Sequence, residues 1–266
     1  MNGTTATRAA TAQRTGEAGG GRMTIAIEAI GLTKEFAGRV AVDSLNLSVA
    51  SGEFFSLLGL NGAGKTTTIR MLTCLLAPTS GDALLLNDSI VTNQNAVKQK
   101  INLSPQETAV APNLTVRENL ELIASIYGCD AAEARARAGV MIEDFGLVER
   151  AGDRTKHLSG GMQRRLSIAM ALITRPEIVF LDEPTLGLDV RARRELWKAL
   201  LALKGKTTIM LTTHYMEEAE ALSDRIGVMH EGRLRALGTA AELMRSTGQG
   251  TLEAAFLKLT DEGAAA

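Results

Sequence analysis

Apolar residues follow two different patterns along this chain, and the change between them predicts its architecture. Residues 25–30 and 41–49 alternate between apolar and other side chains, which is typical of strands in an antiparallel sheet. Residues 54–58, 178–181 and 207–211 instead form nearly continuous apolar runs. Such runs indicate strands that are buried on both faces, as in a parallel sheet.

Helical segments separate the apolar runs. They are predicted at residues 65–77, 116–127, 161–174 and 191–204. Pro78 and Pro176 mark the ends of the first and third segments, because proline removes a helical hydrogen bond. Strands that alternate with helices predict an α/β domain built on a largely parallel sheet.

Polar residues with reactive side chains follow the ends of the predicted strands. A glycine-rich loop follows the first continuous run, and Gln106 follows a shorter apolar segment at residues 101–103. Asp182 and Glu183 follow the second run, and His214 follows the third. In open parallel sheets, ligands bind at the carboxyl ends of the strands. We therefore expect these residues to share one site.

The glycine-rich loop matches a phosphate-binding pattern. Residues 59–66, Gly-Leu-Asn-Gly-Ala-Gly-Lys-Thr, fit G-x-x-x-x-G-K-[ST] between an apolar strand and a helix. Glycines let backbone N–H groups approach phosphate oxygens, and the helix N-terminus favours an anion. Lys65 is expected to reach the β- and γ-phosphates, and the Thr66 hydroxyl to bind Mg²⁺. A chance glycine-rich turn is the alternative. The residues expected to bind nucleotide here are Asn61, Gly62, Ala63, Gly64, Lys65, Thr66 and Thr67.

Two adjacent acids follow the apolar run at residues 178–181. Asp182 is the expected second anchor for Mg²⁺, either directly or through water. Glu183 is the expected general base for the attacking water, a role that contributes about 10²–10⁴-fold in rate. The alternative is a pair of solvated carboxylates at a strand end.

Composition narrows the possible functions. The 266 residues carry 29 Lys and Arg against 30 Asp and Glu, so the formal net charge is −1. This balance gives no general attraction to nucleic acid or anionic lipid, and aromatic residues at 3% do not suggest a base-stacking surface. We expect no nucleic-acid partner. No apolar stretch approaches the ~18 residues needed to cross a bilayer, so any membrane-spanning segment would belong to another chain.

The first 22 residues differ from the rest of the chain. They are rich in Thr, Ala and Gly, contain three arginines and one acid, and have no apolar segment typical of a secretory signal. We expect a disordered tail at 1–22, or a start assigned too far upstream of Met23. Cys74 and Cys129 are far apart and predict neither a disulfide scaffold nor a zinc cluster.

The pentad Leu-Ser-Gly-Gly-Met at residues 158–162 makes the pattern specific. With the phosphate loop before it and the Asp-Glu strand after it, residues 25–238 resemble the ATP-binding subunit of ABC transporters. By itself, Ser159 reads as the N-cap of a glycine-containing helix. The resemblance implies that Ser159, Gly160 and Gly161 contact ATP held by the other subunit of a dimer. Met162 stands where the family commonly has Gln.

Four further residues take roles from the resemblance. It implies that Phe36 stacks on adenine, with packing in the core as the alternative. It implies that Gln106 contacts Mg²⁺ and signals to a membrane subunit, with an ordinary loop amide as the alternative. It also implies that Asp189 lies at the dimer interface and that His214 contacts the γ-phosphate. An N-cap role is compatible with the position of Asp189, and a surface histidine is the alternative for His214.

The resemblance also implies a fold and a domain layout. The fold would be that of an α/β P-loop NTPase with a mostly parallel central sheet, an N-terminal antiparallel β subdomain and an inserted α-helical subdomain. The ATPase domain would span residues 23–240, with the helical subdomain at about 108–165. Residues 241–266 would form a short C-terminal extension.

The predicted function is an ATP-binding and ATP-hydrolysing subunit that drives a separate integral-membrane permease. Two such subunits, identical or merely similar, would close over ATP and Mg²⁺ at the inner, cytoplasmic face of the cell membrane. Two segments, residues 158–165 and residues 251–260, resemble the drug- and sodium-exporter branch, which favours export. For residues 251–260 the alternative is an amphipathic helix that only packs against the domain. An importer ATPase, a soluble non-transport ATPase of the same family and a phosphate-loop kinase are the competing functions.

Overall fold

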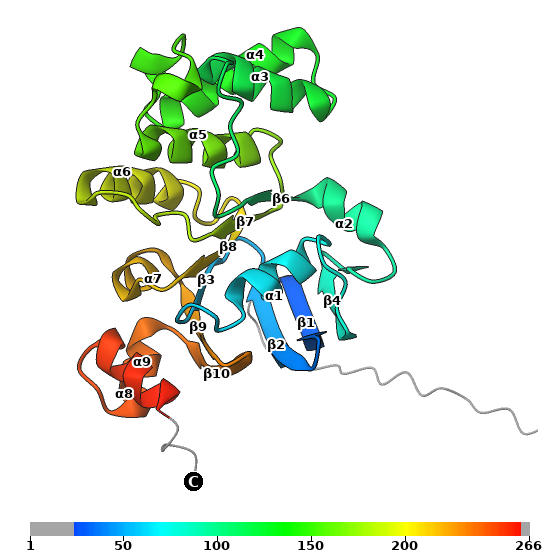
Figure 1. Cartoon of the computed structure of the whole chain (residues 1–266), viewed down its shortest axis with the longest axis vertical. Coiled ribbons are helices and arrows are strands. Elements are labelled where there is room, and N and C mark those ends of the chain that lie inside the picture. Colours follow the sequence, from blue (N-terminus) through cyan, green and yellow to red (C-terminus); the bar gives the residue numbers. More distant parts are fainter. Residues whose placement is uncertain (1–23, 262–266) are drawn as a thin grey trace, which may run out of the picture.

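The computed structural model describes residues 24–261, and the predicted tail at 1–22 lies outside this range. Two sheets form its centre (Figure 1). One sheet has four strands in the order β2-β1-β4-β5, and the other has six in the order β10-β9-β3-β8-β7-β6. The strands are β1 (Ile25–Phe36), β2 (Arg39–Ala50), β3 (Phe54–Leu58), β4 (Ser80–Leu85), β5 (Asp88–Ser89), β6 (Ile101–Ser104), β7 (Ile178–Asp182), β8 (Thr208–Thr213), β9 (Arg225–His230) and β10 (Arg233–Gly238).

The four-stranded sheet is antiparallel, as the alternating pattern predicts. β1 pairs with β2 so that Ile27 faces Val49 and Ala29 faces Leu47, and all four side chains are buried. Ile30, one position further along β1, is 51% exposed. The alternation thus gives the sheet one buried and one solvent-facing side. Both strands are longer than the alternating segments that predicted them.

The six-stranded sheet is parallel except at one edge. β6, β7, β8, β3 and β9 run parallel, and only β10 pairs antiparallel, with β9. Every residue of β3, β7 and β8 is buried, which explains their continuous apolar sequences. Their carboxyl ends meet along one edge and bring the reactive residues together. The predicted fold class is confirmed.

Helices cover the parallel sheet and form a separate layer beyond β6. α3 begins with a capping box made by Thr115 and Glu118, and Asp130 caps α4. α1 ends at Leu72, five residues before the predicted end, because the chain turns at Cys74 with a φ of 56°. The helices are α1 (Lys65–Leu72), α2 (Gln94–Lys100), α3 (Val116–Ile126), α4 (Ala131–Asp144), α5 (Gly160–Leu172), α6 (Val190–Leu201), α7 (Met216–Leu222), α8 (Ala240–Thr247) and α9 (Leu252–Thr260), with short 3₁₀ turns η1 (Val148–Arg150) and η2 (Thr155–His157).

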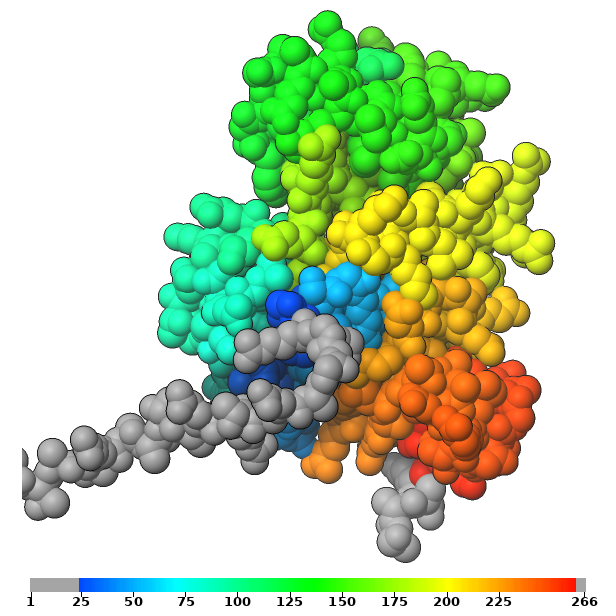
Figure 2. Space-filling model, turned by 180° about the vertical axis from the view of Figure 1, so that it is seen from behind, coloured from blue at the N-terminus to red at the C-terminus, as the bar shows by residue number. Residues whose placement is uncertain are grey.

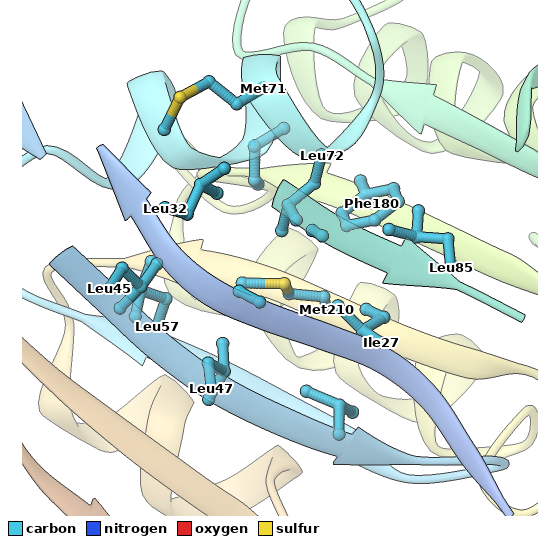
Figure 3. Packing of buried hydrophobic residues seen from close by; sticks show 14 of the residues in the cluster. Ile27, Leu32, Leu45, Leu47, Leu57, Met71, Leu72, Leu85, Phe180 and Met210 are labelled. Carbon is cyan, nitrogen blue, oxygen red and sulfur yellow. The ribbon is translucent and has the colours of Figure 1, made fainter. Parts of the chain in front are cut away.

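Apolar side chains from both sheets share one buried layer. Ile27 and Leu47 of the antiparallel sheet meet Leu57, Phe180 and Met210 of the parallel sheet there (Figure 3). Each such side chain stabilises the fold by about 1.5–3 kcal/mol relative to an exposed position. This layer holds the turn between β1 and β2 beside the phosphate loop.

The two ends of the molecule are helical. α3 and α4 stand at one end, and α8 and α9 lie at the other (Figure 2). Leu243 and Phe256 of α8 and α9 pack against Leu58, Ile226 and Val228 of the parallel sheet, so the C-terminal helices join the same body. Among residues 24–261, no helix combines the length and the apolar character that a membrane span requires.

Candidate functional site

A cleft of about 980 Å³ lies where the carboxyl end of β3 leads into α1. Ten of the residues predicted to bind nucleotide or to act in catalysis line it: Phe36, Asn61, Gly62, Ala63, Gly64, Lys65, Thr66, Thr67, Gln106 and Glu183. The turn between β1 and β2 and the turn between β9 and β10 complete its walls. The structure therefore brings these ten residues to one concave surface.

Two glycines of the phosphate loop, Gly59 and Gly64, are required by close backbone packing. A Cβ atom on Gly59 would lie 2.4 Å from the carbonyl oxygen of Met229, and one on Gly64 would lie 2.4 Å from that of Ala41. Gly64 also has a φ of 103°, which favours glycine. α1 begins at the next residue, so its free N–H groups face the cleft and suit an anion.

The Lys65 ammonium is buried at the base of this loop, with 4% of the residue exposed. It donates hydrogen bonds to the carbonyl oxygens of Gly59 at 2.8 Å and Leu60 at 3.1 Å, and it lies 3.4 Å from Oε1 of Glu183. Burial lowers the pKa of Lys65 below its ordinary value, and the Glu183 charge partly offsets this. The lysine is therefore held rigidly where a phosphate would enter.

The Thr66 hydroxyl lines the cleft, and the Asp182 carboxylate is buried directly beside it without lining the cleft itself. The Thr66 hydroxyl donates to Oδ1 of Asp182 at 3.2 Å, and the Thr212 hydroxyl donates to the same oxygen at 2.5 Å. Mg²⁺ prefers oxygen ligands and usually combines one or two carboxylates with water and substrate phosphates. Within residues 24–261, no cluster of three His, Cys, Asp or Glu residues could hold a metal without such help. The pair fits Mg²⁺ that arrives with a nucleotide.

Glu183 has a strained backbone. Its φ is 46°, a conformation that non-glycine residues adopt rarely. Its N–H donates to the carbonyl and the hydroxyl of Thr212, which holds this conformation in place. The residue is 7% exposed, yet it lines the cleft. Strain that the surrounding structure maintains is characteristic of functional sites.

His214, Gln106 and Phe36 surround this centre. His214 Nδ1 lies 3.0 Å from Oε2 of Glu183, but the approach is poorly aligned and Nδ1 has no hydrogen-bond partner among the described residues. Gln106 is exposed on the rim of the cleft. Phe36 is 46% exposed and is not a core residue; the Lys34 ammonium lies 5.1 Å from its ring centre.

The residues of the 158–162 pentad that are expected to contact a partner's ATP, here called the signature residues (Ser159, Gly160 and Gly161), lie outside the cleft, as does Asp189. Ser159 caps α5 by accepting a hydrogen bond from the N–H of Met162, and Gly160 is exposed. Gly161 packs against α6, where an added Cβ would lie 3.0 Å from that of Ala192. Asp189 caps α6 and is exposed. These residues do not contact the cleft of their own chain.

Sequence reasoning missed several residues of the site. Arg164 and Thr212 hold the loops that carry Asp182 and Glu183, and their side chains act across the fold rather than along the chain. Gly232 has a φ of 78° in the turn that forms one wall of the cleft, and a glycine at this position is a signal in the sequence for such a turn. The additional lining residues are Arg39, Val40, Ala41, Leu60, Leu186, His230, Glu231 and Gly232.

Known proteins resemble this chain closely. The daunorubicin/doxorubicin resistance ATP-binding protein DrrA of Streptomyces peucetius is 44% identical over 230 residues, which cover 86% of this chain and 70% of that protein. The Nod factor export ATP-binding protein I of Paraburkholderia xenovorans is 43% identical over 83% of this chain and 73% of its own length.

A solved structure of an ATP-binding subunit of an ABC transporter superposes with a TM-score of 0.78 and 30% identity, covering 88% of this chain and 98% of that one. A dimeric ATP-binding cassette in a post-hydrolysis state with ADP and Pi superposes with a TM-score of 0.72 and 27% identity, covering 80% of this chain and 98% of its own. The family model described as "ABC transporter" matches residues 42–186. The chain belongs to the ABC transporter family and carries the ATPase domain of that family.

Proposed function

We propose that this protein binds and hydrolyses ATP in order to drive a membrane exporter. The observation that carries the proposal is the arrangement around Glu183, whose carboxylate lies between Lys65 of the phosphate loop and His214 of a neighbouring strand end. The relatives that bear drug-resistance and export names support the direction of transport. An importer ATPase remains the alternative within the same family.

ATP would lie along the cleft with its phosphates on the loop that precedes α1. Backbone N–H groups of residues 61–67 and the Lys65 ammonium would bind the phosphates, and the Phe36 ring would stack on adenine. Thr66 and Asp182 would hold Mg²⁺, and Gln106 on the rim would complete its ligands. When bound, Mg²⁺ would neutralise charge on the phosphates.

Glu183 would act as the general base that accepts a proton from the attacking water. Its burial and the neighbouring Lys65 ammonium hold the carboxylate in one orientation, and orientation is a large part of catalysis. Lys65 would stabilise negative charge that develops on the γ-phosphate. His214 would donate a hydrogen bond to the same phosphate, since its Nδ1 has no aligned partner among the described residues.

Two subunits would complete each site. Four residues that the resemblance assigns to ATP are exposed or half-buried and lie outside the cleft of their own chain: Ser159, Gly160, Gly161 and Asp189. They would therefore contact ATP that is held by a partner subunit. ATP would thus join the two subunits, because phosphate satisfies the N–H groups at the start of α5. The partner would be a second copy or a similar chain.

The permease would be a separate integral-membrane chain, and this protein would then bind it at the cytoplasmic face of the cell membrane. Gln106 and the helices that follow it at about 108–165 would transmit the nucleotide state to the permease. In this proposal residues 23–240 make up the ATPase domain and residues 241–266 a C-terminal extension. A soluble ATPase with no permease is the second alternative.

An affinity capture from mild-detergent membranes tests this proposal. The chain should hydrolyse ATP in a Mg²⁺-dependent manner and should recover a polytopic membrane protein in a fixed ratio. The variant Lys65→Ala, which should bind no ATP, serves as the control: it shows whether capture of the membrane protein requires bound nucleotide. Recovery of a soluble companion alone, from cells in which the chain hydrolyses ATP, would favour the soluble ATPase instead.

A further inference from the structure

Arg164 is a buried arginine that the mechanism above does not use. It lies in the second turn of α5, five residues after Ser159, and only 3% of it is exposed. It does not line the cleft, whereas the start of the same helix, at Ser159 and Gly160, is exposed. Burial of a guanidinium is costly and requires specific partners.

The hydrogen-bond partners of Arg164 are all backbone carbonyls, one at the last residue of β7 and the others in the loops that follow β7 and β6. Nε donates to the carbonyl oxygen of Pro184 at 2.9 Å, and Nη2 donates to that of Asp182 at 2.8 Å. Nη1 donates to the carbonyls of Pro105 and Gln106, the latter at 3.3 Å. The first loop follows β7 and carries Glu183, and the second follows β6 and carries Gln106. One side chain therefore connects both loops to α5.

The absence of a paired carboxylate makes this arrangement unusual. No acidic side chain among the described residues forms an ion pair with Arg164, and burial lowers its pKa to about 10. The charges of Asp182 and Glu218 partly oppose this shift. The guanidinium thus remains protonated at neutral pH and is stabilised by carbonyl dipoles. Apolar residues could join a helix to a sheet at lower cost, which suggests a role beyond packing.

We propose that Arg164 is a positioning residue that holds Gln106 and Glu183 in a fixed relation to each other and to α5. This inference rests on the proposed function of the two residues. Because α5 begins at the signature residues, a displacement of that helix moves both loops together. Only a planar guanidinium presents donors in enough directions to reach carbonyls on both loops.

Arg165 provides a matched control on the same helix. It is 9% exposed, and its Nη1 donates to the carbonyl oxygen of Phe145 at 3.1 Å and lies 3.3 Å from Glu195. These contacts join α5 to the end of α4 and to α6, not to the loops of the cleft. Loss of Arg165 removes a buried guanidinium of the same helix without disturbing Gln106 or Glu183.

Amide hydrogen exchange of the full chain tests the positions of the loops without relying on activity. Arg164→Gln should accelerate exchange of the amides of residues 106 and 107 and of residues 183, 185 and 186, since both segments lose a fixed partner. Pro105 and Pro184 carry no amide hydrogen. Arg165→Gln should leave both segments as in the wild type and accelerate exchange near residue 145. Unchanged exchange in either cleft segment of Arg164→Gln would overturn the proposal.

Steady-state kinetics test the consequence for catalysis. Arg164→Gln should lower kcat by about 10²-fold with little change in ATP affinity, as small misplacements of catalytic groups do. Arg164→Lys keeps the charge but cannot reach both loops, so it should remain impaired. Wild-type kcat in Arg164→Lys, or equal losses in the Arg164 and Arg165 variants, would overturn the proposal. A wild-type chain without ATPase activity would contradict the proposed function, whereas the exchange result would still decide whether Arg164 holds the loops.

Discussion

His214 and Glu183 face each other across the ends of two neighbouring strands, with Nδ1 of the histidine 3.0 Å from Oε2 of the carboxylate. The other carboxylate oxygen, Oε1, lies 3.4 Å from the Lys65 ammonium. The two oxygens of Glu183 thus contact residues that follow β8 and β3, while Glu183 itself follows β7. The orientation of this carboxylate depends on three strands being in register.

Substitution of Glu183 by Gln should abolish turnover while preserving ATP binding. The amide keeps the size of the side chain but cannot accept a proton from water, so kcat should fall by about 10²–10⁴-fold. In the presence of ATP and Mg²⁺, the variant should accumulate as a dimer by size-exclusion chromatography. The substitution Glu177→Gln, outside the cleft, is the matched control. Wild-type turnover in Glu183→Gln would exclude Glu183 as the base.

Substitution of Lys65 by Ala should remove nucleotide binding. The ammonium is the buried cation of the phosphate loop, and its loss also leaves the carbonyls of Gly59 and Leu60 without these hydrogen bonds. Thermal unfolding with and without ATP checks this, because a ligand raises the unfolding temperature only if it binds. Lys100→Ala, which removes an ion pair with Asp88, should keep the full ATP-dependent increase. An undiminished increase in Lys65→Ala would argue against the phosphate role.

Substitution of Thr66 by Val should raise the Mg²⁺ concentration that hydrolysis requires. Valine preserves the shape of the side chain but has no hydroxyl to bind the ion or to donate to Asp182. Thr66→Ser retains the hydroxyl and should respond to Mg²⁺ almost as the wild type does. Removal of Mg²⁺ by a chelator should stop hydrolysis in all three proteins. Identical Mg²⁺ titrations of Val, Ser and Thr would show that the hydroxyl is not a ligand.

Substitution of Phe36 by Ala should weaken ATP binding by about 1–3 kcal/mol, the usual contribution of stacking between a base and an aromatic ring. Phe36→Tyr keeps the ring and should keep the affinity. Because Phe36 is 46% exposed, neither change should cost much stability, and an unfolding curve serves as the control. Equal affinities for Phe, Tyr and Ala, measured by calorimetry, would mean that adenine lies elsewhere.

Substitution of Glu218 by Gln should stabilise the protein at neutral pH. Glu218 is fully buried and accepts a hydrogen bond from Nε1 of Trp197 at 3.2 Å, but its Oε2 has no aligned partner among the described residues. Burial raises the pKa of Glu218 above the ordinary 4.5, and hydrogen bonding by nearby hydroxyls and Trp197 partly offsets the increase. The folded state therefore binds this proton more tightly than the unfolded state does.

The sign of the pH dependence follows from this raised pKa. Below 4.5 the carboxyl is protonated in both states, and it contributes no penalty. As the pH rises above that value, folding must either retain the proton or bury a charge, so the wild type loses stability relative to Glu218→Gln. The difference between the two unfolding temperatures should grow from acidic to neutral pH. A difference that is constant with pH would indicate that Glu218 does not titrate in this range.

Local patterns in the sequence were sufficient for the phosphate loop and for the positions of the central strands. The loop is a continuous segment, so its residue pattern can be read along the chain, although Gly64, Lys65 and Thr66 also contact the distant residues Ala41, Glu183 and Asp182. The continuous apolar runs likewise reflect burial on both faces, which β3 and β7 confirm. The end of α1 was predicted wrongly, since the left-handed turn at Cys74 has no signal comparable to proline or glycine.

Only the tertiary structure decided which distant residues meet. Thr212 bonds both the backbone of Glu183 and the side chain of Asp182 from 29 and 30 residues away, because β7 and β8 pair in parallel register. Arg164 reaches carbonyls 18 to 59 residues distant in the chain. Short-range periodicity determines whether a segment is a strand or a helix, but the order of strands and the packing of α5 determine these contacts. The sequence by itself therefore selected the candidate catalytic groups, and the fold determined what holds them in place.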